Sequence, residues 1–272
     1  MREYPNLQLG KVTKDATVAI PTVDNCEDTL KCVEQLRRYA PQSDVDYVVV
    51  DDGSEEEVIV KLRENQNKYG YVLKEQRQNL GVSAAINIGW HGARGRMLVN
   101  INNDVKVCSN WIKPWQKLFN ENIKIGAVGA KLLYPGGQLQ HCGCHKVLGG
   151  LEFPHTLGKA FENQTREVWR VTGAFFAVNH ECAKELGGFS TAYATAYEDT
   201  DYCLWLRKHG WAIMYCSEVV AEHFEGKKRG ASPDQKQTRH PMWMHREASS
   251  EVYFKGKWAT LKNVENFNAI PK

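Results

Sequence analysis

The sequence predicts an α/β fold built on a mostly parallel sheet with helices on both of its faces. Short apolar runs alternate with longer stretches of helical periodicity, which is the pattern of consecutive β-α-β units. One run, Asp46-Tyr-Val-Val-Val50, is continuous and β-branched, as expected for a parallel strand buried on both faces. Right-handed crossovers between such strands would keep them parallel.

The first half contains four predicted strands separated by three predicted helices. The strands are residues 17–20, 46–50, 71–74 and 96–101, and the helices are residues 26–39, 55–69 and 81–93. Polar clusters follow three of the strands, at residues 21–25, 51–54 and 102–104. In open α/β sheets, ligands bind outside the carboxyl ends of the strands, so we expect these clusters to form part of a site.

The second half is less regular. We expect strands at residues 125–133, 170–178 and 211–216, helices at residues 180–186 and 198–209, and a loop or hairpin at residues 138–150. Residues 225–240 are basic and contain glycine and proline, which predicts a mobile loop. The aromatic residues of the tail are Trp243, Tyr253, Phe254 and Trp258. We expect them to pack on the core, and acceptor binding or an interface are the alternatives.

Composition places the chain among globular proteins. The chain has 272 residues, 42% of them hydrophobic and 25% charged, and its net charge of +3 is too small to indicate a nucleic-acid partner. No apolar run approaches the roughly 20 residues of a membrane span, and residues 1–14 lack a signal peptide. We expect a cytoplasmic protein, compatible with peripheral contact at the inner face of a membrane, whose eight cysteines are free thiols.

Two glycine-containing segments have both a functional and a structural interpretation. Asp52 could accept hydrogen bonds from a base or ribose, although Asp-Gly-Ser is also ordinary turn chemistry. Asn79 and Gly81 lead into a helix of small residues. Its start could favour a phosphate group, or its small residues could allow tight packing on the sheet.

The segment Asn102-Asn103-Asp104 offers oxygen ligands to a hard divalent cation. Asp104 supplies a carboxylate, and Asn102, two residues earlier on the same face of an extended segment, supplies an amide oxygen. A polar turn is the alternative interpretation. His223 could complete a metal site if it faces Asp104.

Residues 197–201 (YEDTD) open a predicted helix with three acids, Glu198, Asp199 and Asp201. Acids in a first turn stabilise the helix dipole, but three in four residues exceed what capping requires. The functional interpretation is that one of them is a general base.

Other motifs exclude some classes of protein. Residues 141–145 (HCGCH) contain four potential zinc ligands, but no second ligand pair follows at a longer spacing, so we do not predict a zinc site. The sequence contains neither the dinucleotide-binding glycine motif nor the P-loop motif, which argues against dinucleotide oxidoreductases and P-loop enzymes.

Taken in order, these elements resemble the family-two glycosyltransferases over residues 17–223. The matching segments are VAIPTVDN (18–25), VVVDDGS (48–54), NLGVSAAINIGWHGARGRMLVNINNDVKV (79–107), GAVGAKLLYPGGQLQHCG (126–143), TGAFFAVNHECAKELGGFS (172–190) and YEDTDYCLWLRKHGW (197–211). The fourth and fifth segments are most similar to rhamnosyltransferase-like members. The resemblance implies the A-type glycosyltransferase fold, with a Rossmann-like sheet and a smaller mixed sheet in the acceptor half.

The resemblance also implies a role for each motif. A single domain would comprise a nucleotide-binding half (15–108), an acceptor half (109–224) and a loop and tail (225–272). The donor would contact Pro21, Val23, Asp52, Asn79, Gly81, Asn102, Asn103, Asp104 and Gly173, and Ala174 would line the floor beside Gly173. Asp104, Asn102 and His223 would bind the metal. Asp199 would be the catalytic base, paired with Glu198.

The implied activity is an inverting transfer of a hexosyl or rhamnosyl group from a UDP-, GDP- or dTDP-sugar to a carbohydrate hydroxyl in polysaccharide or glycan synthesis. Mn²⁺ or Mg²⁺ would assist. Asn102 replaces the first aspartate of the family's metal motif, and the loss of one charge should weaken metal affinity. A nucleotidyltransferase and a non-catalytic sugar-nucleotide-binding module are the alternatives.

Overall fold

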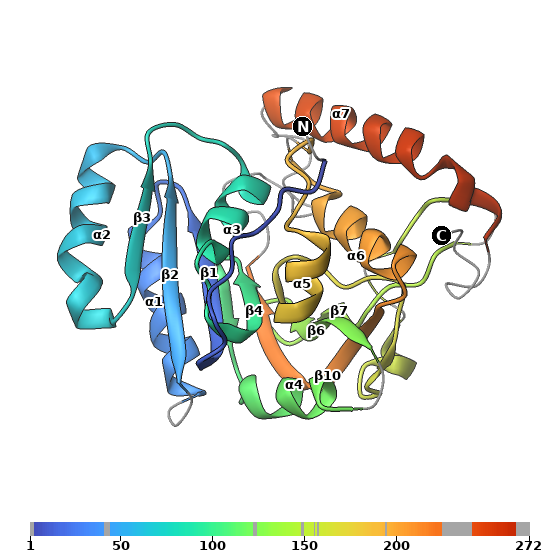
Figure 1. Ribbon diagram of the computed structural model, residues 1–272, viewed down its shortest axis with the longest axis horizontal. Coiled ribbons are helices and arrows are strands. Elements are labelled where there is room, and N and C mark those ends of the chain that lie inside the picture. Colours follow the sequence, from blue (N-terminus) through green and yellow to red (C-terminus); the bar gives the residue numbers. More distant parts are fainter. Residues whose placement is uncertain are drawn as a thin grey trace.

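The computed structural model describes residues 3–40, 44–121, 124–147, 150–154, 156, 158–193, 195–224 and 241–264. Within these residues the chain forms one ten-stranded sheet with the order β3-β2-β1-β4-β9-β6-β10-β5, and β7 and β8 pair with β6 and β10 (Figure 1). The strands are β1 (Lys14–Thr22), β2 (Val45–Asp52), β3 (Val72–Gln76), β4 (Gly95–Ile101), β5 (Val105–Val107), β6 (Ile125–Leu133), β7 (Leu139–His141), β8 (Arg166–Glu167), β9 (Phe175–Asn179) and β10 (Ala212–His223). The helices are α1 (Cys26–Arg38), α2 (Glu56–Tyr69), α3 (Val82–Trp90), α4 (Ile112–Phe119), α5 (His180–Leu186), α6 (Glu198–Lys208) and α7 (Pro241–Lys257), with short 3₁₀ turns at Lys159–Phe161 and Ala259–Asn263.

The four strands of the first half are parallel, as predicted: β1 pairs with β2 and β4, and β2 pairs with β3. The second half does not form a separate, smaller sheet, and that expectation is wrong. The reason is β9, which pairs antiparallel with both β4 and β6 and so joins the two halves edge to edge. The mixed pairing expected for this half is present, because β6 and β10 are parallel while β5, β7 and β8 run antiparallel.

The predicted strand at residues 170–178 is wrong at its beginning. β9 starts only at Phe175, because the preceding residues leave the sheet and turn at Gly173. The predicted strand at residues 211–216 is longer than expected, and β10 continues to His223. The hairpin interpretation of residues 138–150 is correct at its start, where β7 pairs with β6.

Two apolar layers cover the faces of the sheet. One layer combines strand residues with side chains of α1, α2 and α4, including the fully buried Trp111 and Trp115. The other combines strand residues with α3, α5 and α6. α3 lies so close to the sheet that a Cβ on Gly89 would come within 2.5 Å of the Cβ of Ala19. The small residues of this helix therefore have the packing role that was one of their two interpretations.

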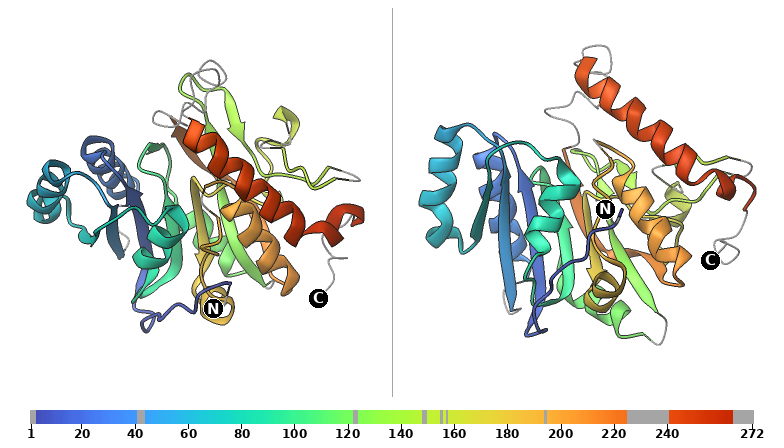
Figure 2. Two further views of the ribbon diagram at one scale, coloured as in Figure 1. Left: turned by 90° about the horizontal axis from the view of Figure 1, so that it is seen from above. Right: turned by 45° about the horizontal axis from the view of Figure 1, so that its top comes forward.

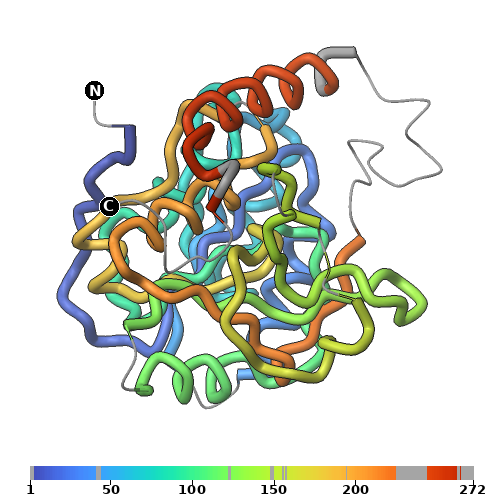
Figure 3. The backbone as a smooth tube through the Cα atoms, turned by 90° about the vertical axis from the view of Figure 1, so that its right-hand side faces the viewer, coloured from blue at the N-terminus to red at the C-terminus, as the bar shows by residue number. Residues whose placement is uncertain are grey.

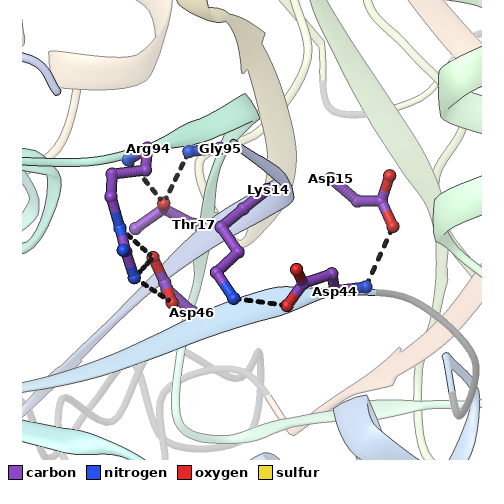
Figure 4. A network of polar contacts seen from close by, with 7 residues as sticks. All are labelled: Lys14, Asp15, Thr17, Asp44, Asp46, Arg94 and Gly95. Atoms are coloured by element: carbon purple, nitrogen blue, oxygen red, sulfur yellow. Dashed lines mark hydrogen bonds and ion pairs between the residues drawn. The ribbon is translucent and has the colours of Figure 1, made fainter. Parts of the chain in front are cut away.

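A polar network closes the edge of the sheet where the parallel strands begin (Figure 4). The buried hydroxyl of Thr17 accepts hydrogen bonds from the backbone N–H groups of Arg94 and Gly95, at 3.2 and 2.9 Å. Two exposed pairs, Arg94–Asp46 at 3.0 Å and Lys14–Asp44 at 2.6 Å, join β1, β2 and β4 from outside. These contacts occupy the end of the sheet where the parallel strands begin. In open α/β sheets ligands bind at the opposite end, outside the carboxyl ends of the strands.

Helix α7 lies beside α6 and at the top of the molecule (Figures 1, 2 and 3). A fully buried carboxylate, Asp201 of α6, attaches it. Asp201 accepts hydrogen bonds from Tyr4 (2.7 Å), Tyr193 (2.8 Å) and the indole of Trp258 (2.8 Å), and it pairs with Lys257 at 2.6 Å. Burial and the neighbouring carboxylate raise the pKa of Tyr4 and Tyr193, so both phenols keep the protons that they donate.

The prediction that the tail packs on the core is confirmed for Phe254 and Trp258, which are buried, whereas Tyr253 is 39% exposed. The side chain of Trp243 and the predicted mobile loop at residues 225–240 lie outside the described residues. All eight cysteines are free thiols, as expected. Among the described helices, none is both long and apolar enough to cross a membrane.

The Thr17→Val substitution should destabilise the protein by about 1–3 kcal/mol, because it keeps the side-chain shape but leaves two N–H groups at a buried position without their acceptor. Urea unfolding would measure this loss. The Arg94→Met substitution is the comparison, since it removes an exposed ion pair that contributes at most about 1 kcal/mol. If both variants lost the same free energy of unfolding, the buried Thr17 hydroxyl would not be the important acceptor at this end of the sheet.

The Asp201→Asn substitution should lower the free energy of unfolding by on the order of 3 kcal/mol, because it leaves the Lys257 ammonium beside a neutral amide in a mostly buried position. Urea unfolding followed by tryptophan fluorescence would report it. Lys255→Met, which breaks an exposed pair with Glu251, serves as the control and should change stability by less than about 0.5 kcal/mol. A loss below about 1 kcal/mol for Asp201→Asn would show that α7 is held by other contacts.

Candidate active site

The polar clusters meet in one cavity of about 770 Å³. Its volume is within the usual range for small-molecule sites. Every residue that the sequence singled out for the site lines it: Pro21, Val23, Asp52, Asn79, Gly81, Asn102, Asn103, Asp104, Gly173, Glu198, Asp199 and His223. The convergence follows from the parallel sheet, which brings the ends of β1, β2 and β4 to the same edge.

On the β2 side of the cavity, Asp52 is nearly fully buried and its carboxylate organises the backbone. Its two oxygens accept hydrogen bonds from the N–H groups of Leu80 (2.8 Å) and Gly81 (2.9 Å). The side chain of Asn79 donates to the carbonyl of Asp52 at 3.2 Å. Burial raises the pKa of Asp52, and these N–H groups oppose that rise. The turn interpretation of Asp52 therefore accounts for both carboxylate oxygens, which fix the backbone of Leu80 and Gly81 at the cavity wall.

Asp104 and His223 face each other across the end of the sheet. The His223 Nε2 atom lies 3.3 Å from Asp104 Oδ1, and both side chains are mostly buried. The other ring nitrogen, Nδ1, is 2.9 Å from Oε1 of Gln140, an acceptor. Nδ1 therefore donates its proton to Gln140, and Nε2 is the ring nitrogen that faces Asp104 and would bind a cation placed between the two side chains. Sequence reasoning found His223 and Asp104 but not Gln140.

This donor set fits a hard divalent cation. Two ligands at neighbouring positions of an octahedron with metal–oxygen distances of about 2.1 Å lie about 3 Å apart, close to the separation of Asp104 Oδ1 and His223 Nε2. Within the described residues, no group of three His, Cys, Asp or Glu side chains is gathered that could enclose a metal alone. Oxygen atoms from Asn102, water or a bound phosphate would have to complete the coordination.

The neighbouring Asn103 has a clear structural role. Its amide donates to the hydroxyls of Thr22 (3.0 Å) and Thr29 (3.2 Å), at the end of β1 and in α1. The backbone N–H of Asn102 donates to the carbonyl of Ala174 at 2.9 Å. The segment that carries Asp104 is thus held on both sides.

Asp199, like its neighbour Glu198 in α6, lines the cavity. One carboxylate oxygen accepts from the N–H of Gly173 at 2.8 Å, and the other accepts from the N–H and hydroxyl of Thr200 at 2.6 and 3.1 Å. These donors and the N-terminus of the helix favour the ionised carboxylate. The side chain is 16% exposed, so a ligand in the cavity can reach it.

The dipeptide Gly173-Ala174 connects Asp199 with the segment that carries Asp104. Gly173 donates its N–H to Asp199, and its carbonyl accepts from the side chain of Asn100. The Ala174 carbonyl binds the backbone of Asn102. A Cβ at position 173 would lie 3.2 Å from the Cβ of Asp199, a tight contact, so a larger residue here would press on the Asp199 side chain.

The chain enters α6 through two residues in the left-handed region of backbone space. Ala196 and Tyr197 have φ values of 61° and 67°, which cost energy for residues with a Cβ. The ring of Tyr197 stacks on Phe254 of α7 at 5.1 Å, which helps to hold this conformation. The acidic pair is therefore presented by a bend that α7 supports.

Several cavity residues were not found from the sequence. They are Arg170, the wall at residues 151–154, and four charged residues of α7, namely Arg246, Glu247, Glu251 and Lys255. Only Arg170 has a sequence signal: it is the single charged residue in the apolar run 168–178. The α7 residues have none, because their place depends on how Asp201 attaches the helix.

Residues 141–145 (HCGCH) contact the segment at residues 170–172, which leads into Gly173. His141, Cys142 and Cys144 are buried. The Nε2 atom of His141 accepts a hydrogen bond from the backbone N–H of Thr172 at 3.3 Å. Cys144 and Arg170 form a backbone bridge. These contacts hold the segment that leads into Gly173, which explains HCGCH without a metal.

Two solved structures with similar folds contain a nucleotide or a nucleotide sugar together with Mn²⁺. GalNAc-T7 with UDP, GalNAc and Mn²⁺ superposes with a TM-score of 0.64 at 15% identity, over 93% of this chain and 55% of that one. The mannosyltransferase PcManGT from Pyrobaculum calidifontis, in complex with GDP-Man and Mn²⁺, gives a TM-score of 0.60 at 17% identity, over 94% and 67% of the two chains. At these identities the likeness establishes the fold.

Two curated bacterial proteins are similar in sequence. The uncharacterised protein y4gI of Sinorhizobium fredii (strain NBRC 101917 / NGR234) is 28% identical over 258 residues, which is 90% of this chain and 27% of that protein. The O-antigen biosynthesis protein RfbC of Myxococcus xanthus is 28% identical over 149 residues, 51% of this chain and 12% of that protein. The chain therefore spans only a small part of each of these relatives.

Residues 14–243 match the family described as glycosyltransferase like family 2. The match contains all the strands of the sheet and all the predicted site residues. The chain belongs to the glycosyltransferase family 2-like proteins and has the A-type glycosyltransferase fold.

Proposed function

We propose that this chain is an inverting, metal-dependent glycosyltransferase that moves a hexosyl or rhamnosyl group from a nucleotide-diphosphate sugar to a carbohydrate hydroxyl. The observation that carries the proposal is the shared cavity, where the Asp104–His223 pair and the open carboxylate of Asp199 are joined by Gly173-Ala174. A role in polysaccharide or glycan synthesis is supported by the similarity to RfbC, named as an O-antigen biosynthesis protein.

The nucleotide would lie on the half of the cavity formed by β1, β2 and β4. Pro21, Val23, Asp52, Asn79 and Gly81 line that half and offer backbone and amide groups to a base and ribose. Asp104, His223 and Asn102 would hold Mn²⁺ or Mg²⁺ at its end, and the bound ion would neutralise the diphosphate leaving group. The Mn²⁺ complexes with UDP and GDP-Man in the two structural neighbours support this arrangement.

Asp199 would accept the proton of the acceptor hydroxyl as that oxygen attacks the anomeric carbon. The carboxylate is reachable from the cavity and hydrogen-bonded in its ionised form, as a base for this step must be. The hydroxyl would approach from the side of the sugar opposite the diphosphate, so a single displacement inverts the anomeric centre. The N–H of Gly173 holds Asp199, and the carbonyl of Ala174 holds the segment with Asp104. This arrangement supports an approach of the hydroxyl from one side and departure of the diphosphate on the other.

The acceptor would enter between residues 151–154 and α7. The half-buried rings of Phe153 and Tyr197 line the cavity there and offer apolar surface, while Glu251 and Lys255 offer charged groups that can bond to hydroxyls. Aromatic faces beside such polar groups suit a sugar ring, which has apolar and hydroxylated surfaces. The choice of acceptor would then depend on α7, the element whose position Asp201 fixes.

The Asp199→Asn substitution should lower turnover by about 10²- to 10⁴-fold, because an amide cannot accept the proton, while nucleotide binding stays near that of the unmodified protein. Release of nucleoside diphosphate from UDP-, GDP- and dTDP-sugars would be measured with sugar acceptors and with water alone. The matched control is Glu181→Gln, which neutralises an exposed acid in the first turn of α5.

Unchanged turnover in Asp199→Asn would refute the assignment of the base. Pyrophosphate release from nucleoside triphosphates would instead indicate a nucleotidyltransferase. Tight donor binding with no release of diphosphate by the unmodified protein, under any of these conditions, would indicate a non-catalytic sugar-nucleotide-binding module.

The Asp104→Ala substitution should weaken Mn²⁺-dependent nucleotide binding by at least tenfold, because it removes the charged ligand of the site. Gln140→Leu should have a smaller effect of about tenfold, because it only releases the His223 ring from its orientation. Thermal shift with UDP-, GDP- and dTDP-sugars, with and without Mn²⁺, would measure both. Asp44→Ala, at the opposite edge of the sheet, is the control. Binding of equal strength in EDTA would contradict a metal role.

A further inference from the structure

Arg170 is a buried cation at the wall of the cavity. It is 4% exposed, and its guanidinium lies in the bend between the Cys144 bridge and Gly173. Burying an isolated charge is costly, so a buried arginine needs an anionic partner and hydrogen-bond acceptors. The contacts of this side chain therefore indicate which groups around it must be negative.

Arg170 contacts Asp199 on one side and Phe153, in the wall formed by residues 151–154, on the other. Its Nη1 atom lies 3.7 Å from Oδ2 of Asp199, and its Nη2 donates to the carbonyl of Phe153 at 3.0 Å. Its Nε has no hydrogen-bond partner among the described residues. The nearby thiols of Cys144 and Cys203 cannot balance the charge, because burial raises their pKa to about 12. The acids at the start of α6 are thus the source of negative charge.

We propose that Arg170 is a positioning residue for the base, which keeps Asp199 ionised and fixes it against the wall formed by residues 151–154. This inference rests on the proposed function, because it concerns the same reaction. Arg170 acts through Asp199 and does not itself touch the reacting atoms. Its contact with Phe153 ties the base to the side of the cavity where the acceptor would enter.

The other charged side chains near Asp199 include both acids, which would raise its pKa, and cations, which would lower it. They are Glu198 and the buried Asp201 from α6, and Arg246, Glu247, Glu251 and Lys255 from α7. Asp201 is already balanced by Lys257, and Glu251 by Lys255. Arg170 Nη1 lies within ion-pair distance of the Asp199 carboxylate, so the removal of Arg170 should act directly on that carboxylate.

The experiment compares pH profiles of nucleoside diphosphate release for Arg170→Met, Arg170→Gln and Arg170→Lys. A cation beside a carboxylate lowers its pKa by about one to three units, so its loss raises that pKa. Activity requires the ionised base, so the acidic limb of kcat in both neutral variants should move to higher pH by about one to three units. Arg170→Lys, which keeps the charge, should return the acidic limb most of the way to its position in the unmodified protein.

Arg207→Met is the matched control. Arg207 is equally buried, pairs with Glu167 at 2.8 Å and bonds to the carbonyl of Trp169, next to Arg170, but it does not line the cavity. Its loss should lower stability and leave the acidic limb where it is. Arg170→Gln keeps a donor for the Phe153 carbonyl and guards against misfolding of the Met variant.

Three outcomes would overturn the inference. One is an acidic limb that stays in place in the folded neutral variants, and another is a fall in rate by the same factor at every pH, as a purely structural role would give. The third is a shift in Arg170→Lys as large as that in Arg170→Gln. If the unmodified protein releases diphosphate and Asp199→Asn does not, these outcomes refute the role of Arg170 and leave the proposed function standing.

Discussion

The short dipeptide Gly173-Ala174 is the constraint on which the rest of the cavity depends. On one side its carbonyl groups hold Asn100 and Asn102, and through Asn102 the segment with Asp104. On the other side its N–H holds Asp199. A backbone segment has no rotatable side chain, so it sets the separation of Asp104 and Asp199 more rigidly than a contact between two side chains could. The backbone of Gly173 also lies close to Asp199, since a Cβ there would come within 3.2 Å of the Asp199 Cβ.

The acids of α6 have separate tasks although they are neighbours in sequence. Asp199 opens onto the cavity, whereas Asp201 is fully buried and binds Tyr4, Tyr193, Trp258 and Lys257. Because residues two apart on a helix point in different directions, one turn can serve both chemistry and assembly. The first few residues of the chain and its last described helix therefore meet at the helix that presents the base. This arrangement couples the shape of the acceptor side to the stability of α7.

Much of the sheet and of the cavity could be predicted from the sequence, because both follow from local patterns. Apolar runs predict strands, and a parallel sheet brings their ends together, which places Asp52 and Asp104 at one edge. The beginning of β9 could not be predicted, because residues 170–174 have strand-like composition, yet their backbone groups bind Asp199 and Asn102. Gln140 and the charged face of α7 could not be predicted either. They reach the cavity through contacts between residues far apart in the sequence.

Few ligands of the proposed metal site would carry a negative charge. Asp104 would be the single carboxylate, His223 would contribute a ring nitrogen, and Asn102, which replaces the first aspartate of the family's metal motif, would contribute an amide oxygen. A divalent cation gains most from anionic oxygens, so the diphosphate of the donor would supply much of its binding energy. Linkage then requires the reverse, that the cation strengthens donor binding by the same factor. A site of this kind would hold metal and donor together, and would release both once the leaving group departs.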